Sequence, residues 1–215
     1  MMLTYSGYLV GIGIADVTGP ATETTMMGYA VPDQKTSGIH TRLFSRAFIF
    51  KANTSDSLVF VSVDVLGIGH AIKREVIKRL ATSIGPGVYR DDNIMLSATH
   101  THSGPGGYHQ YFLPTIPNGG FIDESFQIFV NGIVKSIARA HLNIKPSKLY
   151  HVEGKLANAN KNRSPSAYLR NPIEERLKYK SDTDHTFFQI NIFDATDETP
   201  RGVINWFASS FYELE

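Results

Sequence analysis

The stretch LVFVSVDVLGIGHAIKREVIKRLATSIGPGVYRDDNIMLSAT, residues 58–99, decides the fold. LVFVSVDV (58–65) and NIMLSAT (93–99) are nearly continuous apolar runs, the pattern of strands that are covered on both faces. Residues 71–83 between them have the spacing of an amphipathic helix, with basic residues on the polar face. The apolar face of this helix consists of Ile72, Val76, Ile77 and Leu80. The stretch therefore predicts a strand, a helix and a second strand.

Further strands and one long helix are predicted outside this stretch. Runs rich in β-branched and aromatic residues predict strands, and the N-terminus forms an early strand and turn. These runs are residues 45–50, 148–156, 186–193 and 202–208. Apolar residues spaced by three and four predict a helix over Glu124–His141, with Asp123 as its N-cap. Residues 103–122 and 157–180 lack periodicity and are predicted to be long loops, which in a compact domain are usually functional or mobile. The order of elements predicts an α/β (α+β) fold, with a mixed β-sheet core and helices packed outside it.

Composition excludes several classes of protein. The net charge of +1 gives no electrostatic footprint for nucleic acid, so no nucleic-acid partner is expected. The chain has no cysteine, which excludes disulfides, thiolate zinc sites and thiol nucleophiles, so a metal would need His, Asp, Glu or Tyr ligands. The N-terminus lacks the basic region of a signal peptide, and no segment approaches the ~20 apolar residues that span a bilayer.

Two histidines one residue apart stand where the second apolar run meets glycines, in NIMLSATHTHSGPGG (93–107). If the strand continues, His100 and His102 point to the same side, because residues i and i+2 share a face. Such a pair suits a divalent cation such as zinc, or else one ring binds a metal while the other hydrogen-bonds substrate or a reacting water. Alternatively, the pair consists of two polar residues that leave an edge strand and bond backbone or water. The glycines favour a site, because they allow the backbone to approach a ligand closely.

Three other polar features are candidates for the same site. Residues 28–42 mix turn residues with charged ones. Residues 160–168 (NKNRSPSAY) place Arg163 in a polar loop, where its planar guanidinium can clamp a carbonyl or an oxyanion. For both segments the alternative is a solvated loop. Asp64 ends an apolar strand, where active-site carboxylates often sit, although capping of the strand end is the commoner role.

Taken together, these segments resemble the neutral ceramidase family, zinc-dependent amidases that split ceramide into sphingosine and a fatty acid. The matching segments occur in family order over nearly the whole chain. They are GIGIADVTGP, MMGYAVPDQKTSGIHTRLFSRAFIF, AIKREVIKRL, NIMLSATHTHSGPGGYHQY and NRSPSAYLRNP. The resemblance implies that His100 is the first zinc ligand and that His102 and Arg163 contact the substrate or the reacting oxygen. In this chemistry zinc lowers the pKa of a water molecule and polarises the amide carbonyl, while an arginine or histidine stabilises the oxyanion.

The resemblance also implies that the chain is incomplete. In the family, a sequence like GVINWFA (202–208) runs directly into a second zinc-ligating histidine, and Glu and Tyr ligands follow much later. Here GVINWFA is followed by SSFYELE. We therefore expect residues 1–208 to be the N-terminal part of the catalytic domain and residues 209–215 to be a divergent tail. Catalytic zinc normally has three protein ligands, so with one assigned ligand the site is incomplete and the chain alone is expected to be inactive.

Members of the family are secreted or anchored at the cell surface. The resemblance therefore implies ceramide as substrate and a membrane surface as a partner of the full-length form. Two other functions fit the same residues. One is a non-catalytic module that binds lipid or regulates a full-length partner, and the other is a different His-x-His metallohydrolase that completes its site by dimerising. The oligomeric state is not predicted by the sequence.

Overall fold

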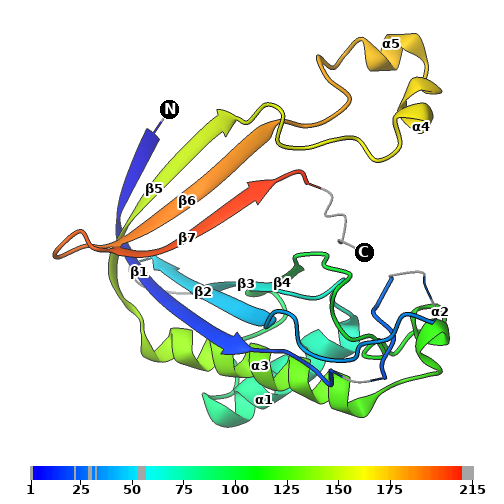
Figure 1. Cartoon of the computed structure of the whole chain (residues 1–215). Coiled ribbons are helices and arrows are strands. Elements are labelled where there is room, and N and C mark those ends of the chain that lie inside the picture. Colours follow the sequence, from blue (N-terminus) through cyan, green and yellow to red (C-terminus); the bar gives the residue numbers. More distant parts are fainter. Residues whose placement is uncertain (1, 22, 29–30, 32, 53–56, 210–215) are drawn as a thin grey trace. The chain divides into compact units, whose positions relative to one another are not determined.

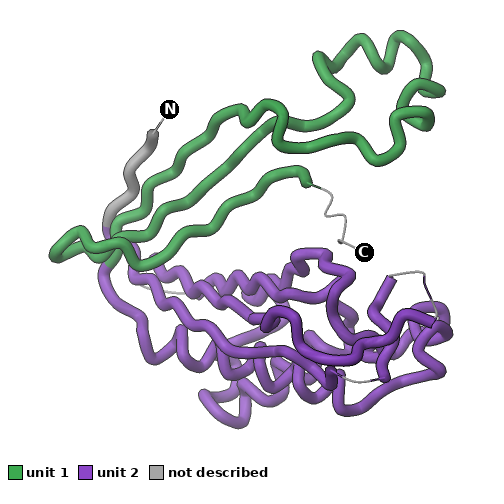
Figure 2. Tube along the Cα trace, in the orientation of Figure 1, with its two compact units in different colours: residues 1–6, 147–215 green, residues 7–146 purple. Residues whose placement is uncertain are grey.

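The computed structural model describes residues 2–21, 23–28, 31, 33–52 and 57–209 (Figure 1). The described chain divides into two compact units, which Figure 2 shows in different colours. Unit 1 comprises residues 2–6 and 147–209, and unit 2 comprises the described residues of 7–146. Residues 210–215, most of the expected divergent tail, lie outside the described residues.

Unit 2 is built on a sheet whose strands lie in the order β4-β3-β2-β1. These strands are β1 (Met2–Asp16), β2 (Phe44–Ala52), β3 (Ser57–Val63) and β4 (Ile94–Ala98). Strand β2 pairs antiparallel with β1 and with β3, whereas β4 pairs parallel with β3. Parallel neighbours need a crossover connection, and helix α1 (His70–Ser83) lies in that connection. The sheet is therefore mixed, which confirms the predicted fold class.

Helices α1 and α3 (Asp123–Leu142) cover one face of this sheet (Figure 1). The alternate valines of β3, Val59, Val61 and Val63, are fully buried in the core that the helices share with the sheet. The helical residues of this core are Ile72, Val76 and Leu80 of α1 and Phe126, Phe129, Val130, Ile133, Ile137 and Ala140 of α3. Both amphipathic helices are confirmed, each beginning one residue earlier than predicted. Asp123 is therefore the first helical residue, and Ile122 takes the N-cap position that was predicted for it.

Close contact between β1 and α3 depends on glycine. A Cβ added at Gly13 would lie 2.2 Å from the Ser136 carbonyl oxygen, and one at Gly11 would lie 2.1 Å from that of Ala140. Both obstacles are helix backbone atoms, so no side chain fits at either position. Beside them, Ser136 Oγ and Ser45 Oγ of β2 are hydrogen-bonded at 2.8 Å, which satisfies two buried hydroxyl groups. The sequence GIG in β1 thus allows α3 to lie directly on the sheet.

Strand β4 lies at the edge of the sheet, which corrects one expectation. Its apolar run predicted a strand covered on both faces, but the Met95 side chain is 55% exposed. The side chain of Ile94, on the other face, is buried in the core against α1. The run NIMLSAT therefore belongs to a strand with one covered face and one open face.

Unit 1 contains the antiparallel strands β5 (Lys145–Lys155), from Ser147 onward, β6 (Thr186–Asp194) and β7 (Pro200–Phe207). Aromatic side chains pack across the three strands. His151 of β5 lies 4.3 Å from Phe188 of β6, and Phe188 meets Trp206 of β7 edge to face at 5.4 Å, measured between ring centroids. Along the whole sheet the hydrogen-bonded strand order is β4-β3-β2-β1-β5-β6-β7, with β1 belonging to both units.

Both predicted loops contain short helices. They are α2 (Phe112–Thr115), the 3-10 helix η1 (Ile116–Asn118), α4 (Pro165–Leu169) and α5 (Ile173–Arg176). A helix of one turn is too short to show an apolar period, so the sequence pattern could not reveal it. In the described part of the chain, no helix combines the length and the apolar character that a membrane span requires.

Candidate functional site

His100 and His102 lie just beyond β4, in a turn rather than in a continued strand. The amides of Thr99 and His100 still bond the end of β3 and the chain just after it, donating to the carbonyl oxygens of Val63 at 2.9 Å and Val65 at 3.0 Å. His100 then adopts a φ of +65°, a left-handed conformation that is uncommon for a residue with a side chain. The strand therefore does not continue through His100, and the condition under which the two rings would share a strand face is not met. The turn nonetheless brings the two rings together, with centroids 5.1 Å apart and planes at 89°.

Each imidazole is oriented by a backbone carbonyl. His100 Nδ1 lies 2.9 Å from the Leu66 carbonyl oxygen, and His102 Nδ1 lies 3.1 Å from that of Met27. A carbonyl oxygen only accepts, so in each neutral ring Nδ1 carries the proton and Nε2 carries the lone pair. Histidine metal ligands typically have this form, with the second ring nitrogen donating to a carbonyl or carboxylate. The pair therefore offers two nitrogen lone pairs within one turn of chain.

Met27 reaches His102 through pairing between two segments that are far apart in the sequence. The Met27 amide donates to the Gly104 carbonyl at 3.2 Å, and the Gly106 amide donates to the Thr25 carbonyl at 2.9 Å. These bonds hold the residues before the polar segment 28–42 against the loop that follows His102. Sequence reasoning missed Met27 and Leu66, because they act through backbone carbonyls that any residue type supplies.

The glycines after the motif pack against the chain's own side chains. A Cβ added at Gly106 would lie 2.1 Å from Asn118 Oδ1, and one at Gly107, where φ is +80°, would lie 2.6 Å from Ile122 Cγ1. Asn118 is in turn bonded through Oδ1 to the Thr25 hydroxyl. These two glycines therefore allow residues 103–122 to fold closely on themselves, and close approach of a ligand to this loop stays a prediction.

Arg163 lies in unit 1, in the chain between β5 and α4, while both histidines lie in unit 2. Its side chain is exposed, and the described residues include no hydrogen-bond or ion-pair partner for it. The loop is held by its asparagines: Asn160 Nδ2 donates to the carbonyls of Asp184 and Ala208, both at 2.7 Å. Arg163 is therefore available to a ligand, and its contact with the histidine pair stays a prediction.

Other candidate ligands do not join the pair. Asp64 accepts a hydrogen bond from the Phe44 amide at 2.9 Å and pairs with Arg46 at 2.9 Å, which fits the strand-capping alternative. Across the described ranges, no group of three or more His, Asp or Glu side chains is placed to hold a metal ion. Two imidazole nitrogens suit zinc chemically, but they fall short of the three protein ligands of a catalytic zinc site.

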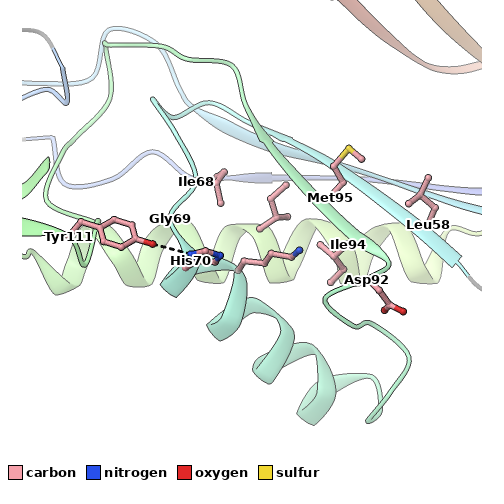
Figure 3. A pocket seen from close by; sticks show the side chains of 10 residues that line it. Leu58, Ile68, Gly69, His70, Asp92, Ile94, Met95 and Tyr111 are labelled. Carbon is pink, nitrogen blue, oxygen red and sulfur yellow. Dashed lines mark hydrogen bonds between the residues drawn. The ribbon is translucent and has the colours of Figure 1, made fainter.

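A groove of about 460 Å³ lies along the free edge of β4, at the start of α1 (Figure 3). Its rim includes His70, whose Nδ1 is 3.0 Å from the Tyr111 hydroxyl. Its other lining residues are Leu58, Ile68, Gly69, Lys73, Asp92, Ile94, Met95 and Leu96. The groove includes neither His100 nor His102, so it is a separate feature of unit 2.

Burial of His109 makes the stability of unit 2 depend on pH in a way that can be tested. Its side chain is 9% exposed, and Nδ1 has no hydrogen-bond partner in the part of the chain that the structure describes. Burial lowers the pKa of His109, although a hydrogen bond with the Gly67 backbone opposes the shift. The unfolded chain therefore binds the proton more readily, so this residue makes unit 2 less stable as the pH falls below about 6.5.

We expect the melting temperature of the wild-type chain to fall more steeply between pH 7.5 and 5.5 than that of His109→Asn, which has nothing to protonate at this site. Thermal melts followed by circular dichroism over this range give the two slopes. His40→Asn, at an exposed position, is the control and is expected to keep the wild-type slope. Parallel slopes for wild type and His109→Asn would contradict the prediction.

Comparisons with known proteins agree on one family. Residues 8–211 match the family model described as neutral/alkaline non-lysosomal ceramidase, N-terminal. The chain is 44% identical to a neutral ceramidase of Oryza sativa subsp. japonica over 210 residues, which cover 97% of this chain and 26% of that protein. It is 42% identical to a neutral ceramidase of Drosophila melanogaster over 206 residues, covering 96% of this chain and 29% of that protein.

Solved structures give the same result. The neutral ceramidase of Pseudomonas aeruginosa matches with a TM-score of 0.88 and 40% identity, covering 94% of this chain and 32% of that one. A ceramidase complexed with C2 matches with a TM-score of 0.87 and 40% identity. The chain thus spans about a quarter of the length of these curated relatives and about a third of the crystallised chain. Because sequence, family model and fold agree over almost all of its length, the chain belongs to the neutral ceramidase family.

Proposed function

We propose that the chain carries the first part of the active site of a zinc amidase, which hydrolyses the N-acyl amide bond of ceramide to sphingosine and a fatty acid. The observation that supports this is the pair of imidazoles, each with Nδ1–H held by a carbonyl, in a member of the neutral ceramidase family. Two nitrogens are too few for catalytic zinc, and the chain spans about a quarter of its relatives. The 215-residue chain alone is therefore proposed to be inactive.

The residues divide the work as follows. His100 would hold zinc through Nε2, and zinc, when bound, makes a water molecule more acidic and the amide carbonyl more electrophilic. His102 Nε2 accepts the proton that the attacking water loses, because its Nδ1 already carries a proton that is held by Met27. The same proton passes to the amide nitrogen as the C–N bond breaks, so sphingosine leaves as the amine. The Arg163 guanidinium donates to the oxygen on which negative charge develops.

The test is a chimera in which residues 8–208 of this chain replace the matching region of the Oryza sativa relative. We expect the chimera to release fatty acid from ceramide, and His102→Ala or Arg163→Ala in it to lower kcat about 100-fold. Arg170→Ala, at another exposed arginine of the same segment, is the control and is expected to leave kcat unchanged. A folded, zinc-loaded chimera that leaves ceramide intact would contradict the proposal, and ceramide hydrolysis by the 215-residue chain alone would refute its inactivity.

A further inference from the structure

We propose that Gly28 is a positioning residue for His102, and that the ring can take its orientation only because residue 28 has no side chain. The observation is steric. A Cβ added at Gly28 would lie 2.6 Å from His102 Nδ1 and 2.7 Å from His102 Cε1. Real Cβ atoms do not approach other atoms so closely, so the imidazole edge rests directly on the glycine.

The contact involves the ring atom that matters for proton placement. His102 Nδ1 also bonds the carbonyl of Met27, the residue just before Gly28, at 3.1 Å. The ring thus contacts both ends of the Met27–Gly28 peptide unit. It donates a hydrogen bond to the Met27 carbonyl, and it packs against the Gly28 Cα, which carries no side chain. A methyl group at position 28 would meet Nδ1 and Cε1 first, and the ring would have to leave the carbonyl to avoid it.

The surroundings limit where the ring can move. The same added Cβ would lie 3.2 Å from Leu66 Cδ2. The centroid of the His102 ring is 5.1 Å from that of the His100 ring. Gly28 also has a φ of +73°, a region that glycine adopts without strain. Position 28 therefore excludes a side chain for two separate reasons, backbone conformation and contact with His102, which suitable controls can separate.

The consequence concerns the tautomer of His102. With the Met27 bond intact, Nδ1 carries the proton and Nε2 the lone pair. Once the ring is displaced, the neutral imidazole is free to protonate at either nitrogen, and Nε2 loses its fixed role as acceptor. The effect on catalysis rests on the function proposed above, whereas the effect on the ring does not.

The first experiment reads the ring directly, without zinc or ceramide. In the 215-residue chain at pH 8, two-bond ¹H–¹⁵N spectra of the histidines report which ring nitrogen carries the proton. We expect wild-type His102 to show a single Nδ1–H signature and Gly28→Ala to lose it. Gly119→Ala is the control for backbone strain, because Gly119 has a φ of +69° and open space around its Cβ position. Gly38→Ala, with open space and no positive φ, is the control for the substitution itself.

A second measurement covers the case in which Gly28→Ala does not fold. Urea unfolding is followed for Gly28→Ala, for His102→Ala and for the double variant. We expect Gly28→Ala to lower the urea midpoint strongly in the presence of His102 and, in its absence, by no more than Gly119→Ala does. Equal losses in both backgrounds would overturn the proposal, as would an unchanged His102 spectrum in folded Gly28→Ala. An inactive chimera with these couplings intact would count against the proposed function alone.

Discussion

Gly13→Ala is expected to lower the free energy of unfolding of unit 2 by about 3 kcal/mol, a large loss for a single methyl group. The new Cβ would lie 2.2 Å from the Ser136 carbonyl oxygen, 2.5 Å from the Ala140 amide nitrogen and 2.9 Å from Arg139 Cβ. Two of these are backbone atoms of α3, so relief requires the whole helix to shift. The same helix carries Phe129, Ile133 and Ile137 of the core, which would lose contacts with the sheet.

Urea unfolding followed by far-ultraviolet circular dichroism measures this loss. The single tryptophan, Trp206, lies in unit 1, so its fluorescence reports on that unit and not on the site of the change. Gly67→Ala is the matched control, because a Cβ there has open space. It is expected to change the unfolding free energy by less than about 1 kcal/mol. Similar losses for the two variants would mean that α3 does not lie directly on β1.

Periodicity alone predicted most of unit 2. The spacing of Ile72, Val76 and Leu80 fixed one helix to within a residue, and the apolar runs located the strands on either side of it. The close approach of β1 to α3 was not predicted, because it depends on which helix lies opposite Gly11 and Gly13. Glycines within a strand are nevertheless a usable signal, since they mark places where another backbone comes near.

Only part of the candidate site was predicted from the sequence. His100 and His102 could be recognised by their residue type and spacing. Their orientation depends on the carbonyls of Leu66 and Met27, which lie 34 and 75 residues away along the chain and carry no residue signature. Gly28 is also visible in the sequence, in MMGYAVPDQ, but its role can be recognised only once the position of the His102 ring is known.

His100→Ala is expected to weaken zinc binding by the 215-residue chain about 100-fold, or about 2.7 kcal/mol. The substitution removes the Nε2 lone pair of a ring that Leu66 holds in the metal-binding tautomer. Alanine also carries a Cβ, so the strain of the left-handed backbone at residue 100 is similar in the two chains. A change in strain therefore does not explain the loss of zinc affinity. Competition with a chromophoric chelator at pH 7.5 gives the dissociation constants.

His102→Ala in the same titration separates two roles for the second ring. If His102 contacts substrate or the reacting oxygen, as we propose, the variant keeps zinc affinity within about threefold of wild type, because the ligand nitrogen of His100 is untouched. If it is a second ligand, the loss matches that of His100→Ala. His40→Ala removes an exposed imidazole and controls for adventitious binding. Equal zinc affinity in wild type and His100→Ala would show that this imidazole holds no metal, and the assignment of the site to it would fail.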